Sequence, residues 1–138
     1  MEKIIQAKYE DHKKSIVHIR HTVFVIGQNV PSEIEIDGKD PQCFHALITI
    51  DDTPIATGRM EKDGHIGRIA VLEEYRGHHY GQKIMGKLEE IARNEGIRRV
   101  YLGSQVHAMN FYEKLGYTPY GEFYFEAGIE HRRMQKSL

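Results

Sequence analysis

The sequence has few of the features that mark several common classes of protein. Its 138 residues include no tryptophan and only one cysteine, and the formal net charge is −1 at pH 7. The single thiol, Cys43, has no partner for an internal disulfide, which favours a reducing compartment. A chain so close to neutrality has no general attraction for nucleic acid or for an anionic membrane. We therefore expect neither as a partner.

Long apolar runs are also missing. Residues 1–14 have no apolar core of signal-peptide length, and no later run approaches the length of a membrane span. We find no repeat, low-complexity tract or linker. A chain of 138 residues is long enough to bury one ordinary core. We therefore predict one domain over residues 1–138, located in the cytoplasm.

Recognisable metal-binding spacings are lacking as well. The sequence has nine histidines, but His78 and His79 are adjacent and would diverge on a helix. No His-x-x-x-His or Cys-x-x-Cys pattern of the kind found in zinc sites occurs. The sequence therefore predicts no metal.

Apolar periodicity and turn residues predict alternating helices and strands. Helices are expected at 10–24, between Gly81 and Gly96, and within 105–117, and strands at 3–8, 44–50, 55–61, 69–72, 99–102, 117–125 and 129–135. A right-handed crossover would make one strand pair parallel, and hairpin connections make others antiparallel. The predicted fold class is therefore mixed α/β, with a central, mostly antiparallel sheet flanked by helices.

Residues 25–42 are predicted to be irregular, because two glycines and two prolines interrupt them. A loop of this length in a compact domain usually has a function, such as a lid or a substrate wall. It is also acidic, with carboxylates at Glu33, Glu35, Asp37 and Asp40. These carboxylates either form a solvated face or attract a cationic amine.

The stretch from Arg68 to Gly96 has the arrangement of an anion-binding site. An apolar strand leads through a polar turn into Arg-Gly-His-His-Tyr-Gly at residues 76–81, and a helix follows. The first turn of a helix has unpartnered N–H groups and a positive dipole end. Glycines in the turn permit close approach of a ligand, and Arg76 adds a charge suited to phosphate. The stretch has no Gly-Lys-Ser/Thr and no Gly-x-Gly-x-x-Gly, which argues against nucleoside triphosphates and dinucleotides and favours another pyrophosphate.

The same turn resembles motif A of the GCN5-related N-acetyltransferase (GNAT) superfamily, which is Arg/Gln-x-x-Gly-x-Gly/Ala after a strand. Arg76 and Gly81 match the first and last positions, and His79 replaces the middle glycine. We therefore expect His79 either to narrow the loop or to carry a side chain in the left-handed conformation. A second motif, Ala-x-x-Phe-Tyr-x-x-x-Gly-Tyr at residues 108–117, follows at about the distance usual in that superfamily.

Two further segments resemble a smaller bacterial branch, the YjcF/ElaA-like acetyltransferases. One is Val-Phe-Val-x-x-Gln-x-Val-Pro at residues 23–31, and the other is Gly-Ile-Glu-His-x-x-Met at residues 128–134. Together the four segments extend the resemblance over nearly the whole chain.

The resemblance implies direct transfer of an acetyl group from acetyl-CoA to the amine of a small molecule, by an enzyme that forms a homodimer. In this superfamily the central strand splays from its parallel neighbour, and the pantetheine arm lies in the gap. Gln105 stands where relatives have a polar cofactor-contacting residue. The implied cofactor-binding residues are Ile69, Ala70, Val71, Arg76, Gly77, His78, His79, Tyr80, Gly81, Gln105 and Tyr112.

Tyr112 matches the tyrosine that protonates the departing thiolate in many relatives, because a phenol is protonated at neutral pH. The alternative is an aromatic core contact. For the base, relatives use acidic residues at positions where this chain has Gly27 and Gly67. Glu33, Glu35, His45 and His131 are then the candidates, of which we predict Glu35 and His131.

Two other functions are compatible with the same sequence. One is acetylation of a protein or peptide amine, which requires an open acceptor groove. The other is a non-catalytic module that binds acyl-CoA, which the glycines at positions 27 and 67 bring into consideration.

Overall fold

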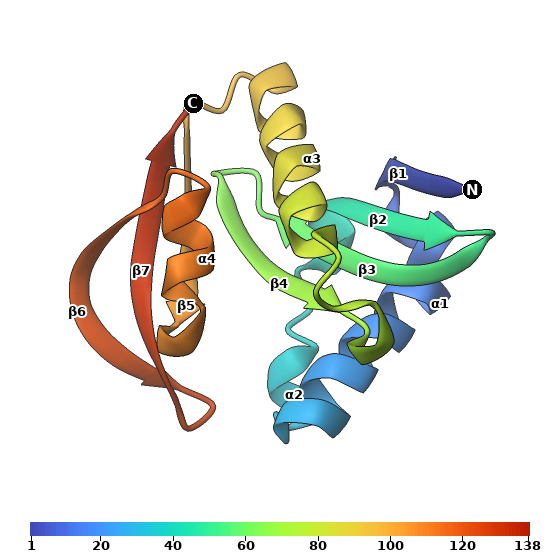
Figure 1. The fold of residues 1–138 in the computed structure, drawn as a ribbon, viewed down its shortest axis with the longest axis horizontal. Coiled ribbons are helices and arrows are strands. Elements are labelled where there is room, and N and C mark those ends of the chain that lie inside the picture. Colours follow the sequence, from blue (N-terminus) through green and yellow to red (C-terminus); the bar gives the residue numbers. More distant parts are fainter.

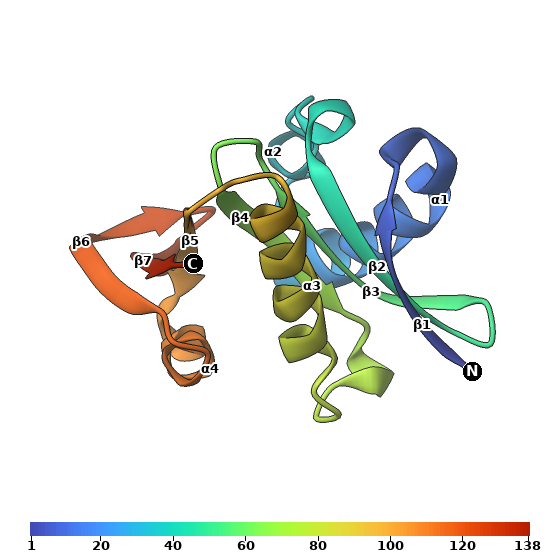
Figure 2. The same ribbon diagram turned by 90° about the horizontal axis from the view of Figure 1, so that it is seen from above.

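The computed structural model describes residues 1–138 and contains one seven-stranded sheet with helices on both of its faces (Figures 1 and 2). The strands are β1 (Glu2–Ala7), β2 (Phe44–Ile50), β3 (Thr53–Met60), β4 (His65–Val71), β5 (Arg99–Gln105), β6 (Thr118–Glu126) and β7 (Ile129–Ser137). The α-helices are α1 (Tyr9–Arg20), α2 (Ser32–Glu35), α3 (Tyr80–Asn94) and α4 (Met109–Lys114). The strand order is β1-β2-β3-β4-β5-β7-β6, and only β4 and β5 are parallel. The predicted fold class is confirmed.

The core has two parts, one on each face of the sheet. Ala46 and Ile48 of β2 pack in the cluster that contains the apolar stripe of α3, and Leu47 packs in the cluster of α1. Since neighbouring residues of a strand point to opposite faces, a central strand covered on both sides reads as an unbroken apolar run. This burial fixes α3, and therefore the turn before it, against β4.

β4 and β5 pair over two residues only, His65 with Tyr101 and Ile66 with Leu102. Beyond these pairs the two strands diverge, and the ribbons of β4 and β5 separate clearly in Figure 1. A β-bulge lies where the divergence begins, because the register of β3 and β4 shifts between Thr57 and Arg59. A bulge bends its strand and increases its twist, which accounts for the opening of the sheet at this place.

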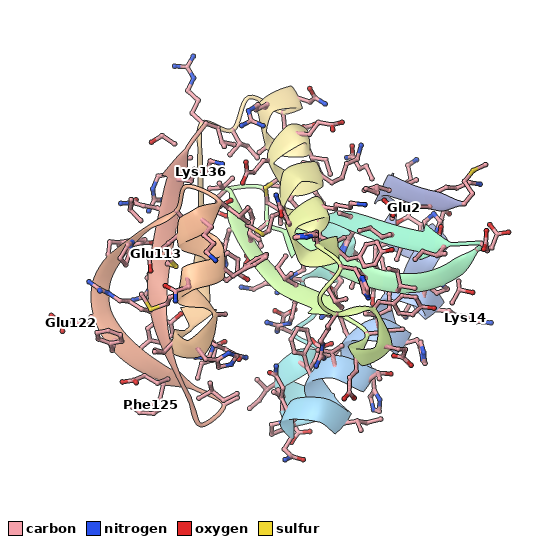
Figure 3. All side chains as sticks on the ribbon, viewed as in Figure 1. Glu2, Lys14, Glu113, Glu122, Phe125 and Lys136 are labelled. Carbon is pink, nitrogen blue, oxygen red and sulfur yellow. The ribbon has the colours of Figure 1, made fainter.

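Three side chains, which we call the clamp, connect α3 with β7 across the opening between β4 and β5. They are Glu89 in the C-terminal half of α3, Tyr117 and Lys136. The carboxylate of Glu89 in α3 accepts hydrogen bonds from the Tyr117 hydroxyl at 2.8 Å and the Lys136 ammonium at 2.9 Å. Lys136, labelled in Figure 3, also donates to the carbonyl of Leu115 at 2.8 Å. Charge-assisted hydrogen bonds of this kind are about twice as strong as neutral ones. The clamp therefore joins α3 to β7 and to the end of α4.

Several boundaries differ from the sequence prediction. Strand 99–102 continues as β5 to Gln105, because β7 pairs with it along its whole length, up to Gln105 with His131. The predicted helix within 105–117 consequently begins with a 3₁₀ turn, Val106–Ala108, and α4 covers only the next six residues. Strand 69–72 is the end of a longer β4, whose start lies at His65 in the hairpin with β3.

The segment predicted to be irregular, 25–42, has partial helical structure. The helix predicted at 10–24 is α1 followed by a π-helical turn, His21–Ile26, and then come α2 and a 3₁₀ turn, Asp40–Gln42. None of the helices is long and apolar enough to cross a membrane.

Candidate active site

A cavity of about 610 Å³ lies in the wedge between β4 and β5. It brings together predicted site residues from five elements: Glu35 of α2, Ile69 of β4, Gln105 of β5, Tyr112 of α4 and His131 of β7. Its other wall comes from the segment that runs from the π-helical turn after α1 into α2, with Phe24, Gln28, Val30 and Ile34. Residues up to 109 positions apart in the sequence, from Phe24 to Arg133, therefore line one space.

A second cavity, of about 280 Å³, lies at the predicted pyrophosphate turn. It is lined by Val71, Tyr75, Arg76, Gly77, His79, Tyr80, Gly81 and Phe111. β4 connects the two spaces, because Ile69 lines the larger cavity and Val71 lines the smaller one. Of the residues predicted here, His78 is exposed and lines neither cavity, and the side chain of Ala70 is buried in the α1 cluster.

The turn before α3 has the backbone of an anion site. Gly77 has a φ of 82° and His79 a φ of 66°, so the predicted left-handed conformation of His79 is confirmed. No side chain caps α3, and its first internal hydrogen bond runs from the Lys83 N–H to the His79 carbonyl. The preceding N–H groups of the first turn are therefore available to an anion. Arg76 donates from Nε to the Val71 carbonyl at 3.1 Å, which holds its guanidinium at the end of β4.

Gly81 has a packing role in this turn. A Cβ at Gly81 would lie 3.3 Å from the ring of Phe111, so the glycine lets the aromatic side chain of α4 approach the first turn of α3. Phe111 in turn contacts Tyr112 edge-on, with ring centroids 5.0 Å apart. The anion site and the tyrosine are thus linked through one aromatic contact.

Tyr112 has the properties of a proton donor. Its ring also packs edge-on against Tyr117, with centroids 6.0 Å apart, and no protein group hydrogen-bonds to its hydroxyl. Desolvation by burial raises the pKa of Tyr112 to about 12. The phenol is therefore protonated at neutral pH, and its proton is not engaged elsewhere in the protein.

His131 has the properties of a proton acceptor. Its Nδ1 lies 2.7 Å from the carbonyl oxygen of Ile129. Because a carbonyl oxygen only accepts, Nδ1 carries the hydrogen, and the neutral ring keeps a lone pair on Nε2. The ring is 8% exposed and stacks on Tyr124 at a centroid distance of 5.5 Å. The fold therefore fixes both the tautomer and the orientation.

Glu35, the other predicted base, serves as an anchor instead. Its Oε1 accepts from Arg20 Nε at 2.9 Å, and its Oε2 accepts from Arg20 Nη2 at 2.7 Å and from Arg68 Nε at 2.8 Å. Both oxygens are thus engaged by guanidinium groups. Of the remaining candidates, Glu33 is exposed, and His45 is fully buried outside the cavity, where burial lowers its pKa.

Glu35 belongs to an ion cluster that we define as Arg20, Arg59, Arg68, Glu35, Asp37 and Asp40. Arg59 donates to Asp37 at 2.8 and 2.9 Å and to Asp40 at 3.0 Å, and Arg20 donates to Asp40 at 2.6 Å. Burial alone would raise the pKa of Asp37, but the hydrogen bonds from Arg59 outweigh it and hold this pKa well below its usual range. Three carboxylates are matched by three guanidiniums. These acidic residues are therefore neither a solvated face nor a free attractor for an amine, and both sequence-based alternatives are wrong for them.

Gln105 connects the two walls of the larger cavity. Its amide nitrogen donates to Gln28 Oε1 at 2.9 Å, and its amide oxygen lies 2.6 Å from His107 Nε2. The predicted contact of Gln105 with the cofactor stays a prediction, since its side chain is engaged within the protein.

Sequence reasoning missed Tyr124 and Gly103. A Cβ at Gly103 of β5 would lie 2.0 Å from the Tyr124 hydroxyl, so only glycine admits this phenol into the cavity wall. Phe125, near the end of β6, is 72% exposed (Figure 3). No cluster of three or more histidine, cysteine or acidic side chains is arranged to hold a metal ion.

Comparisons with known proteins agree with this arrangement. Residues 13–117 match the model of the acetyltransferase (GNAT) family. The chain is 38% identical to the uncharacterised N-acetyltransferase YjcF of Bacillus subtilis, over 97% of this chain and 99% of that protein. It is 36% identical to protein ElaA of Escherichia coli, over 90% of this chain and 86% of that protein.

Solved structures give the same result. The crystal structure of Escherichia coli ElaA superposes with a TM-score of 0.87 at 32% identity, and that of an acyl-CoA N-acyltransferase from Pseudomonas aeruginosa with a TM-score of 0.89 at 25% identity. Each comparison covers 99% of both chains. The chain therefore belongs to the GNAT family of acetyltransferases, and it is an acyltransferase.

Proposed function

We propose that this protein transfers the acetyl group of acetyl-CoA directly to a primary amine of a small molecule, within a ternary complex. The observation that carries the proposal is the course of β4, which leads from an anion-binding turn to a cavity holding both Tyr112 and His131. A proton donor and a proton acceptor in one space are what acyl transfer to an amine requires.

The two cavities and the edge of β4 between them form a groove, which accommodates successive parts of acetyl-CoA. The N–H groups at the start of α3 and the Arg76 guanidinium suit the pyrophosphate. Beyond Ile66 the edge of β4 has no partner on β5, so its main-chain N–H and C=O groups before the Val71 carbonyl, which accepts from Arg76, are free to pair with the amides of the pantetheine arm. The thioester then lies in the larger cavity, where acetyl-CoA supplies an activated acyl group.

Two side chains perform the proton transfers. His131 Nε2 accepts the proton that the amine loses as its nitrogen bonds to the acetyl carbon. Tyr112 donates its hydroxyl proton to the sulfur as the carbon–sulfur bond breaks. Desolvation raises the pKa of a thiol as it raises that of a phenol, so the buried site favours the neutral thiol as the product of this proton transfer. We expect a main-chain N–H of β4 near Ile69 to stabilise the oxyanion.

The size of the cavity supports a small acceptor rather than a peptide. About 610 Å³ is typical of sites for small molecules, and the hydrogen bond between Gln28 and Gln105 crosses between its walls. The homodimer and the cytoplasmic location expected from the sequence are part of this proposal.

The test is a thiol-release assay of acetyl-CoA against a panel of small amines, with the variants Tyr112→Phe and His131→Asn. Loss of the acid or the base should lower kcat by about 10²-fold or more, with acetyl-CoA binding retained. Asn at position 131 keeps an N–H donor for the Ile129 carbonyl, and Tyr120→Phe, which alters a tyrosine outside both cavities, serves as the control. Equal turnover by wild type and Tyr112→Phe would remove Tyr112 as the acid.

A further inference from the structure

Arg68 has an unusual conformation for a residue inside a strand. Its φ is 53°, in the left-handed region that favours glycine. The register of the neighbouring strand pairs Arg59 with Gly67 and Thr57 with Ala70, so Gly58 alone faces both Arg68 and Ile69. Arg68 is therefore the residue at which the bulge of β4 forms.

The bulge sits where the groove opens. The last pair of β4 with β5 is Ile66 with Leu102, immediately before it. After the bulge the side chain of Ile69 returns to the α3 face, where its Cδ1 lies 2.7 Å from the position that a Cβ of Gly58 would take. Gly58 and the bulge together set the direction of β4 between the two cavities.

The ion cluster holds Arg68 from the opposite side of the sheet. Arg68 Nε donates to Glu35 Oε2 at 2.8 Å, and its Nη2 donates to the Glu35 carbonyl at 3.2 Å. Glu35 is fixed in turn by two hydrogen bonds from Arg20, a side chain that is 2% exposed. The side chain of Arg68 is therefore restrained by Glu35, which is itself held in place by Arg20.

Resting on the proposed function, we propose that Glu35 is a positioning residue that acts through Arg68. Its carboxylate holds Arg68 in the left-handed conformation, and this conformation bends β4 away from β5 and opens the groove that receives the pantetheine arm. The segment from the end of α1 to α2, which forms a wall of the larger cavity, is thus coupled through β4 to the binding of acetyl-CoA.

The matched variants Arg68→Gly and Arg68→Ala test the conformational part. Both remove the guanidinium and leave the pair of Arg20 with Glu35 intact, but only glycine adopts the left-handed conformation without strain. We expect acetyl-CoA to bind Arg68→Ala about fivefold more weakly than Arg68→Gly, measured by calorimetry. Equal affinities of the two variants would overturn the proposal.

Glu35→Gln tests the role of the Glu35 carboxylate in two backgrounds, the wild-type protein and the Arg68→Gly variant. It should raise the KM for acetyl-CoA in the wild-type background by a larger factor than it changes kcat, and it should change the KM little when position 68 is glycine. A merely stabilising carboxylate would have the same effect in both backgrounds, and that result would overturn the proposal. If Glu35→Gln does not fold, the comparison of Arg68→Ala with Arg68→Gly still decides it.

A ligand-free readout separates this inference from the proposed function. We expect the amide hydrogen exchange of residues 67–70 to be faster in Arg68→Ala than in wild type and Arg68→Gly, measured by NMR. This difference does not depend on acetyl-CoA. A wild-type protein that fails to bind acetyl-CoA but shows this difference would refute the proposed function and retain the positioning role. No difference in exchange would refute the positioning role.

Discussion

Tyr112 and His131 line one cavity, where Tyr112 can donate a proton and His131 can accept one. Desolvation favours the protonated phenol of Tyr112, and the hydrogen bond from Nδ1 to the Ile129 carbonyl leaves the lone pair of His131 on Nε2. The motif at residues 108–117 predicted Tyr112. The tautomer of His131 was not predictable, because it depends on the side-chain rotamer that turns the ring back to the Ile129 carbonyl at the start of the same strand.

The pKa of Tyr112 leads to a prediction about the alkaline side of the pH profile. A pKa raised to about 12 means that the acid form persists well above the value of 10 for an exposed phenol. We therefore expect kcat for a reactive amine to show no loss from Tyr112 between pH 8 and pH 10.5. Steady-state rates over this range check it. A half-maximal loss near pH 10 that disappears in Tyr112→Phe would contradict this account.

At the scale of elements, α3 is held by the turn before it and by the hydrogen bonds of Glu89 in its C-terminal half. The sequence predicted the turn well, because glycines and an arginine before a helix are local signals. It did not predict the clamp, since Glu89, Tyr117 and Lys136 meet only after β7 has paired with β5. For the same reason the end of β5 and the start of α4 were misplaced.

His79 is the strained position of the turn. Replacing it by glycine should increase the free energy of unfolding by about 0.5–1 kcal/mol, because glycine adopts a φ of 66° without steric cost. His79→Ala, which keeps the strain, is the control. Urea unfolding measures both variants. A glycine variant no more stable than the alanine variant would contradict the assignment of backbone strain to this position.

We expect Tyr117→Phe, which removes a hydroxyl of the clamp, to lower the free energy of unfolding more than a comparable change at the surface. This change leaves the buried carboxylate of Glu89 without one of its donors, which should lower the free energy of unfolding by about 1–3 kcal/mol. Tyr101→Phe removes a similar hydroxyl–carboxylate hydrogen bond, to Asp63 at the surface, and should cost less. Chemical denaturation compares the two. Equal losses would mean that the burial of Glu89 does not matter.

At the scale of the whole molecule, the fold class and the parallel strand pair followed from the sequence by connection rules. The ion cluster did not, because its six members lie between Arg20 and Arg68 and meet only when the segment around α2 folds onto β3 and β4. Charges read along a chain do not reveal their partners. An acidic loop therefore suggested an exposed surface, where the structure has a neutralised and largely buried network.

The cluster and His45 make stability depend on pH. Burial lowers the pKa of His45, so the folded state favours its neutral form, and this contribution is lost as pH falls below about 6.5. For Asp40, burial alone would raise the pKa, but hydrogen bonds from Arg20 lower it, so its contribution is lost as pH falls below about 4. We expect the unfolding free energy in urea to decrease from pH 7.5 to 5.5 and again towards pH 3.5. A constant value over this range would contradict the description of the cluster.

The most direct test of the central claim is a calorimetric titration of the protein with acetyl-CoA, repeated with Arg76→Ala. If the turn before α3 receives the pyrophosphate, wild type binds, and loss of this guanidinium weakens binding about tenfold. Arg132→Ala, a change on β7 outside both cavities, should leave the affinity unchanged. Absence of binding to the folded wild-type protein, or equal affinity of Arg76→Ala, would contradict the assignment of the groove to acetyl-CoA.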